Sequence, residues 1–133
     1  MIIVDSNIYI FGELEGMPEN KLALSKLYES YKSGRLGINA IIASEVFHKL
    51  QKFFGSTEAA AKVSKMVSDQ YADFLQFTPE MIVRASKLAR DFQMTINDAM
   101  IAQQAIETGA AILTDNVKDF KKVGMIKVIP LRG

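Results

Sequence analysis

The chain opens with a stretch that strongly restricts its possible folds, Met1-Ile2-Ile3-Val4-Asp5-Ser6-Asn7. Three successive β-branched apolar residues predict a short strand buried on both faces, which is typical of a parallel sheet covered by helices. The run ends at Asp5, which two small polar residues follow. In open α/β folds, ligands bind just beyond the carboxyl ends of the strands. We therefore expect Asp5 to belong to a functional site.

Further apolar segments alternate with helical patterns along the rest of the chain. We predict additional strands at residues 36–39, 74–77, 110–113 and 125–129. The helices predicted between them lie in residues 8–14, 19–33, 40–54, 56–73, 78–92, 95–108 and 116–122. This alternation predicts an α/β fold with a parallel sheet covered on both faces. We expect residues 1–133 to form a single domain.

Local patterns support several of these helices. Thr78 followed by Pro79 is a typical helix start, and Thr95 with Asp98 matches a capping box. In residues 19–33, the apolar side chains recur at i, i+3, i+4 and i+7, which predicts one buried stripe. That stripe consists of Leu24, Leu27, Tyr28 and Tyr31.

The amino-acid composition limits the kinds of metal site and nucleic-acid binding that the chain can support. The chain of 133 residues has no cysteine and one histidine, so a thiolate or histidine-rich metal site is excluded and any metal ligands would be oxygens. Such ligands suit Mg²⁺, Mn²⁺ or Ca²⁺. The formal charge of +1 excludes a generally basic nucleic-acid binder. We expect a cytoplasmic protein, since neither a leader nor a membrane-spanning segment is recognisable.

Four acidic residues occupy positions that the fold would bring together. Asp5 and Asp115 each follow a strand, so both would emerge at the same edge of a parallel sheet. Asp98 lies in the first turn of a helix that leads into the strand at 110–113, and Glu45 borders an apolar stripe. Gathered carboxylates repel one another, and a divalent cation removes that repulsion. Such a cation also activates water and stabilises phosphoryl oxygens, which favours phosphodiester hydrolysis.

Each acid also has a purely structural interpretation. Asp5, Asp98 and Asp115 could serve only as helix caps, and Glu45 could pair with Lys49 on the helix surface. If the four acids bound one metal ion together, all of these structural interpretations would lose support at once. Side chains that serve only as independent helix caps have no reason to gather at one place.

Four motifs, taken in order, resemble the PIN domain family and most of all the VapC-type toxins of toxin–antitoxin pairs. The motifs are Ile3-Val4-Asp5-Ser6-Asn7, Ser44-Glu45-Val46, Asn97-Asp98-Ala99-Met100-Ile101-Ala102 and Leu113-Thr114-Asp115-Asn116-Val117-Lys118-Asp119-Phe120. The resemblance covers essentially the whole chain. It implies a PIN-like three-layer sandwich with a central five-stranded parallel sheet flanked by helices.

The resemblance also implies a Mg²⁺- or Mn²⁺-dependent endoribonuclease whose catalytic, metal-binding residues are Asp5, Glu45, Asp98 and Asp115. The implied supporting residues are Asn7, Thr114, Asn116 and Asp119. Many relatives carry the fourth acid one residue further on, where this chain has Asn116. Asp115 would then ligate directly or through water, or Asp119 would take the role.

The implied partners are an RNA substrate, a cognate antitoxin protein that blocks the site, and a second copy of the chain in a homodimer. Apolar side chains at Phe47, Phe53 and Phe54 would mark such a contact if one core does not use them all. Two other functions stay open: an RNA-processing nuclease that uses the same site, and a catalytically silent PIN-fold binding module.

Overall fold

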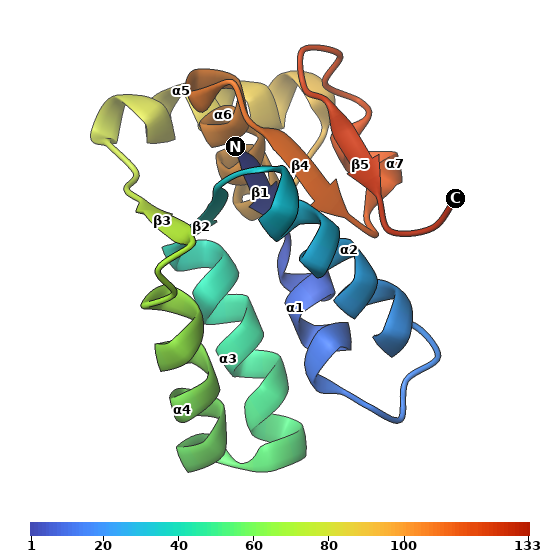
Figure 1. Cartoon of the computed structure of the whole chain (residues 1–133). Helices are drawn as coiled ribbons and strands as arrows, with labels where there is room; N and C mark the ends of the chain where they lie inside the picture. Colours follow the sequence, from blue (N-terminus) through green and yellow to red (C-terminus); the bar gives the residue numbers. More distant parts are fainter.

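The computed structural model describes all 133 residues, in five strands and seven helices. The strands are β1 (Ile2–Val4), β2 (Leu36–Asn39), β3 (Ala72–Leu75), β4 (Ala111–Thr114) and β5 (Val128–Pro130). The helices are α1 (Ser6–Glu13), α2 (Asn20–Ser33), α3 (Ala40–Phe54), α4 (Ser56–Val67), α5 (Pro79–Phe92), α6 (Ile96–Thr108) and α7 (Val117–Phe120). All strands are parallel, in the order β3-β2-β1-β4-β5 (Figure 1). The predicted five-stranded parallel sheet flanked by helices is confirmed.

Successive residues of a strand point to opposite faces of the sheet, which gives this fold two apolar cores. Ile3 joins the larger core, to which α3, α5 and α6 contribute side chains. Val4 joins the smaller core, which α1 and α2 cover. The smaller core consists of Val4, Ile8, Ala23, Leu36, Leu113 and Leu131. The opening strand is therefore buried on both faces, as its run of apolar residues predicted.

The two capping patterns are confirmed. The Thr78 hydroxyl accepts a hydrogen bond from the Met81 N–H at 3.1 Å, and α5 begins at Pro79. The Thr95 hydroxyl accepts one from the Asp98 N–H at 3.3 Å, and α6 begins at the next residue. Because Thr95 caps α6, Asp98 lies in the first turn of this helix, and its side chain is at the carboxyl edge of the sheet.

Helix α4 ends at Val67, six residues before the predicted end, and β3 begins two residues before the predicted strand. Asp69 makes the break, because its side chain accepts a hydrogen bond from the Tyr71 N–H at 2.8 Å and so closes a turn. Tyr71 continues the apolar spacing of the helix across this turn, which explains the overlong prediction. Strand β4 lies one residue later than predicted, β5 begins three residues late and includes Pro130, and α7 ends two residues early.

The buried face of α2 was predicted only in part: Leu27 and Tyr31 pack against the smaller core, as expected. Leu24 and Tyr28 are 48% and 65% exposed, whereas Asn20 and Ala23 are buried. Ala23 lets α2 approach the sheet closely. The Asn20 side-chain amide donates to two carbonyl groups at the end of α1, at 2.8 and 3.1 Å. A small residue and a polar contact thus decide the orientation of this helix. None of the helices is both long enough and apolar enough to cross a membrane.

Candidate active site

Asp5 lies at the carboxyl end of the central strand β1 and caps α1. It is only 4% exposed. One carboxylate oxygen accepts a hydrogen bond from the Ser6 N–H at 2.8 Å. The other accepts from the Thr114 hydroxyl at 2.7 Å and from the Asn7 amide at 3.3 Å. Burial raises the pKa of Asp5, although these hydrogen bonds act in the opposite direction.

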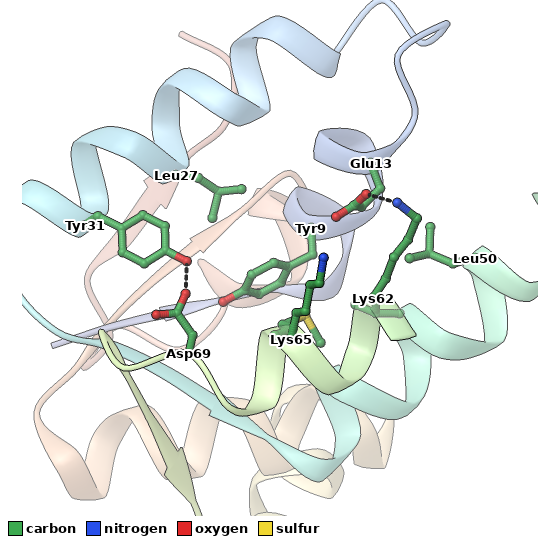
Figure 2. A pocket seen from close by; sticks show the side chains of 10 residues that line it. Tyr9, Glu13, Leu27, Tyr31, Leu50, Lys62, Lys65 and Asp69 are labelled. Atoms are coloured by element: carbon green, nitrogen blue, oxygen red, sulfur yellow. Dashed lines mark hydrogen bonds and ion pairs between the residues drawn. The ribbon is translucent and has the colours of Figure 1, made fainter. Parts of the chain in front are cut away.

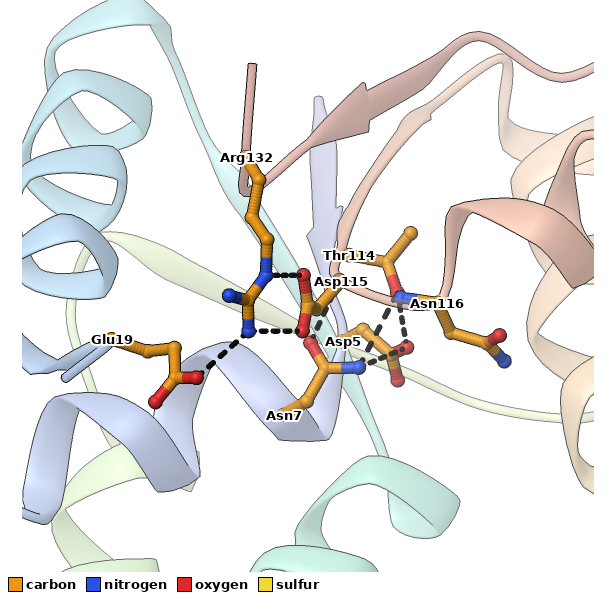
Figure 3. A network of polar contacts seen from close by, with 7 residues as sticks. All are labelled: Asp5, Asn7, Glu19, Thr114, Asp115, Asn116 and Arg132. Carbon is orange, nitrogen blue, oxygen red and sulfur yellow. Dashed lines mark hydrogen bonds and ion pairs between the residues drawn. The ribbon is translucent and has the colours of Figure 1, made fainter. Parts of the chain in front are cut away.

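Asn7 and Thr114 connect the ends of the neighbouring strands β1 and β4 (Figure 3). The Asn7 side-chain oxygen accepts a hydrogen bond from the Asp115 backbone N–H at 3.1 Å. The Thr114 hydroxyl oxygen accepts one from the Asn116 backbone N–H at 2.9 Å. The network therefore fixes the backbone after β4 relative to Asp5, and it contains three of the four residues predicted to support the site.

Glu45 on α3 and Asp98 on α6 lie within electrostatic reach of Asp5. Burial raises the pKa of Glu45, and the charges of Asp5 and Asp98 raise it further. Burial also raises the pKa of Asp98, together with the charges of Asp5 and Asp119. The Asn116 amide donates a hydrogen bond to Asp98 at 3.3 Å. Three separate parts of the chain thus bring carboxylates to one edge of the sheet.

The fourth predicted acid, Asp115, faces a cation. The Arg132 guanidinium contacts both of its carboxylate oxygens, Nε at 2.8 Å and Nη2 at 3.0 Å. Nη2 also donates to Glu19 at 2.8 Å, and this contact lowers the pKa of the Glu19 carboxyl. The backbone of Asp115 is thus connected to Asp5 through Asn7, whereas its carboxylate is paired with Arg132 (Figure 3).

Asp119 on α7 occupies a different setting. It forms an ion pair with Lys122 at 3.3 Å, one turn further along the chain. Its charge nevertheless contributes to the raised pKa of Asp98. The sequence left the fourth acid open between Asp115 and Asp119. In the structure, the first is paired to Arg132 and the second lies within electrostatic reach of Asp98.

Comparison with known proteins identifies the family. A family model described as PIN domain matches residues 2–125. The chain belongs to the PIN domain family. This membership confirms the resemblance that the four motifs carry. No curated protein matches the chain in sequence.

Solved structures with a similar fold include toxins of toxin–antitoxin pairs. VapC20 from Mycobacterium tuberculosis, described as a sarcin-ricin loop cleaving toxin, superimposes with a TM-score of 0.77 at 17% identity, over 98% of this chain and 100% of that chain. VapBC2 from Rickettsia felis, bound to a promoter DNA fragment, gives 0.76 at 19% identity, over 98% of each chain. VapBC-1 from nontypeable Haemophilus influenzae gives 0.76 at 18% identity, over 100% of each chain. The PIN domain therefore has the fold of these toxins.

The donor chemistry of this PIN-domain edge fits a hard divalent cation. No group of three acidic side chains lies close enough to hold a metal ion as the side chains stand. However, none of Asp5, Glu45 and Asp98 forms an ion pair with a lysine, arginine or histidine. Burial raises the pKa of all three carboxyl groups, and the charge of Asp5 raises the pKa of Glu45 and of Asp98 further. A bound cation would remove the repulsion between these carboxylates.

Sequence reasoning missed two contributors to this edge, Arg132 and Glu19. Neither has a neighbouring motif that marks it, because Arg132 meets Asp115, and Glu19 meets Arg132, only through the tertiary fold. Sequence reasoning also missed a buried amide pair. The Asn39 side chain, which caps α3, donates to Gln104 of α6 at 2.8 Å, and both residues are fully buried. This contact joins the helix that carries Glu45 to the helix that carries Asp98.

A separate pocket of about 280 Å³ lies between α1, α2, α3 and α4 (Figure 2). Its walls are Tyr9, Glu13, Leu27, Tyr31, Val46, Leu50, Lys62, Lys65, Met66 and Asp69. The Tyr31 hydroxyl donates to Asp69 at 2.6 Å, and Lys62 pairs with Glu13 at 2.8 Å. None of the acids at the sheet edge lines this pocket. Of the three phenylalanines expected at a contact surface, Phe53 is 56% exposed, and Phe47 and Phe54 pack partly against the core.

Proposed function

We propose that this PIN-domain protein is a divalent-metal-dependent endoribonuclease that acts as the toxin of a toxin–antitoxin pair. One observation supports it most strongly: Asp5, Glu45 and Asp98 gather at the carboxyl edge of the sheet without a positive partner. Such a site attracts a divalent cation, and it lies where ligands bind in open α/β folds. The fold is shared with toxins, one of which is described as a sarcin-ricin loop cleaving toxin, and this supports the proposed substrate class.

The roles follow from the contacts. Asp5, Glu45 and Asp98 would hold Mg²⁺ or Mn²⁺, which when bound supplies a nucleophilic water and stabilises phosphoryl oxygens. Thr114 and Asn7 orient Asp5 by donating to its carboxylate.

The amide of Asn116 orients Asp98 in the same way. Asp115 and Asp119 are the candidates for a fourth acid. These roles make the hydrogen-bonded network a support for the carboxylates, because it fixes Asp5 and Asp98 before any ligand arrives.

The proposal is tested with purified protein and a labelled RNA stem-loop, with and without 5 mM Mn²⁺ or Mg²⁺ (roughly the concentration at which weakly held divalent ions bind). Wild type should cleave only with metal, and Asp98→Asn should lose nearly all activity. Asp91→Asn is the matched control, since Asp91 lies at the exposed end of α5 and pairs with Arg90. Binding of RNA without cleavage under every condition would favour a silent binding module instead.

We also propose an antitoxin protein and a second copy of the chain as partners. Several structures of the same fold are described as VapBC or toxin–antitoxin complexes, two of them on DNA. The pocket in Figure 2 has mostly apolar walls, and its two lysines are balanced by Glu13 and Asp69, so it suits a partner segment that inserts apolar side chains.

Induced expression in bacteria separates a toxin from an RNA-processing enzyme. A toxin should arrest growth, and Asp98→Asn should abolish the arrest. Size-exclusion chromatography with light scattering tests the homodimer.

A further inference from the structure

Arg132 makes the most extensive ion-pair contact at the site. Two of its nitrogens bind the two oxygens of Asp115, and one of these nitrogens also reaches Glu19 (Figure 3). This side-on geometry, with short charge-assisted hydrogen bonds, is the strongest arrangement of an arginine and a carboxylate. A single guanidinium thus connects the segment after β5, the start of α2 and the end of β4.

The position of Arg132 is set by the residue before it. Leu131 is fully buried in the smaller core, and its N–H donates to the Thr114 carbonyl at 3.0 Å. Glu19 depends on Arg132, because its second oxygen is buried and has no hydrogen-bond partner. Packing and backbone pairing therefore hold the backbone of this segment beside Asp115, and the side chain of Arg132, which is 57% exposed, is held by its ion pairs with Asp115 and Glu19.

Asp115 is connected to the centre of the site. Its backbone N–H donates to Asn7, and the Asn7 amide donates to Asp5. The backbone of Asp115 is thus already fixed next to the acids, and only its side chain is directed to Arg132. A side-chain rotation would change which cation the carboxylate faces, without movement of the strand.

We infer that Arg132 is a positioning residue that acts through Asp115: it serves as an internal cation that keeps this carboxylate out of the metal site and thereby limits metal affinity. The inference rests on the proposed function, because it requires a divalent cation at Asp5, Glu45 and Asp98. Release of Arg132, by substitution or by a ligand that captures the guanidinium, would give the site a fourth carboxylate.

The direction of the effect follows from charge. With Arg132 in place, the guanidinium balances the charge of Asp115, and a bound metal ion faces only the three unpaired acids Asp5, Glu45 and Asp98. Without Arg132, one more negative charge lies beside the site, and the attraction for a dication increases. A purely structural ion pair predicts the opposite, since loss of a fixed contact would loosen the edge of the sheet and weaken metal binding.

The test is calorimetric titration of the metal-free protein with Mn²⁺, without RNA and at constant ionic strength. We expect Arg132→Gln to lower the Kd for Mn²⁺ by about tenfold, as one extra nearby carboxylate would. Arg132→Lys should give an intermediate Kd, because lysine keeps the charge but cannot make the two-point contact. Circular dichroism melting confirms that each variant is folded.

Two comparisons make the result specific. Arg35→Gln breaks a similar two-point pair with Asp73 at the other end of the sheet, and it should leave the Kd unchanged. In an Asp115→Asn background, Arg132→Gln should change the Kd less than about threefold, because no carboxylate remains to be released. A full tenfold gain in that background would show that only the long-range charge of Arg132 matters, and would overturn the inference.

An unchanged or raised Kd in Arg132→Gln would also overturn it. That failure is distinguishable from failure of the proposed function. If Mn²⁺ binds wild type and Asp98→Asn abolishes the binding, the metal site stands and only the role of Arg132 is refuted. If no Mn²⁺ binds any of the proteins, the metal site and the role of Arg132 are refuted together.

Discussion

The Thr114 hydroxyl donates a 2.7 Å hydrogen bond to the buried carboxylate of Asp5, across 109 positions of sequence. The contact exists because β1 and β4 are neighbours in register, so that their carboxyl ends meet. The same hydroxyl oxygen accepts a hydrogen bond from the Asn116 N–H. The Thr114 side chain thus holds both the Asp5 carboxylate at the end of β1 and the backbone that follows β4.

Thr114→Val should destabilise the protein by about 1–3 kcal/mol, because Asp5 loses a donor and the Asn116 N–H loses its acceptor in a buried place. Thr114→Ser keeps the hydroxyl and should cost about 1 kcal/mol, the value of one lost methyl group. Urea denaturation at neutral pH measures both. A smaller loss for valine than for serine would show that packing of the methyl group, which valine keeps, matters more than the hydrogen bond.

Without metal, Asp98→Asn should be more stable than wild type at neutral pH. The folded protein raises the pKa of Asp98 above its ordinary value of 3.8, through burial and the charges of Asp5 and Asp119. The folded state therefore binds more protons than the unfolded chain in mildly acidic solution, and wild-type stability falls as the pH rises through that window. Asparagine removes the charge, so its advantage should be largest at neutral pH and vanish near pH 3.8.

Thermal melts of the two proteins in buffers from acid to neutral pH test this expectation, with EDTA present. Asp91→Asn, at an exposed position, should stay within about 0.5 kcal/mol of wild type throughout. A constant difference between Asp98→Asn and wild type at every pH would contradict an electrostatic origin.

Much of the sheet could be predicted, because buried parallel strands carry continuous apolar runs and parallel strands end at a shared edge. Asp5 was placed by that argument alone. Thr95 and Asp98 were placed by a local capping pattern, which depends only on residues within one turn. These features are encoded over a few adjacent positions, and the structure confirms their placement.

Contacts between distant segments were not predictable. The pair of Arg132 with Asp115 depends on β5 lying beside β4, and no periodicity marks either side chain. The face of α2 was predicted only in part, because apolar spacing alone cannot show that Ala23 and Asn20 pack inward in place of Leu24 and Tyr28. The roles of the four acids in metal binding stay a prediction, since placement at one edge does not measure affinity.

The buried pair of Asn39 and Gln104 should contribute to stability through the two helices it joins. Gln104→Met keeps the length of the side chain but leaves the Asn39 amide without its acceptor. A loss of about 1–3 kcal/mol is expected, as for an unsatisfied buried donor. Gln103→Met, one residue earlier, removes only a contact with Glu107, which keeps its pair with Arg84, and should cost less than about 1 kcal/mol. Urea denaturation compares them, and equal losses would refute a special role of the buried pair.

Metal binding itself should raise the stability of the folded protein. A ligand that binds only the folded state adds about 2.7 kcal/mol at one hundred times its Kd. Mn²⁺ should therefore raise the wild-type melting temperature, and Asp5→Asn should lose most of the rise. Asparagine caps a helix about as well as aspartate, so the variant should still fold and start α1 at the same place. Asp91→Asn should respond like wild type. If millimolar Mn²⁺ (on the order of the weakest calcium and magnesium sites) leaves the wild-type melting temperature unchanged, the free protein does not bind the metal, and the metal site proposed at these acids is contradicted.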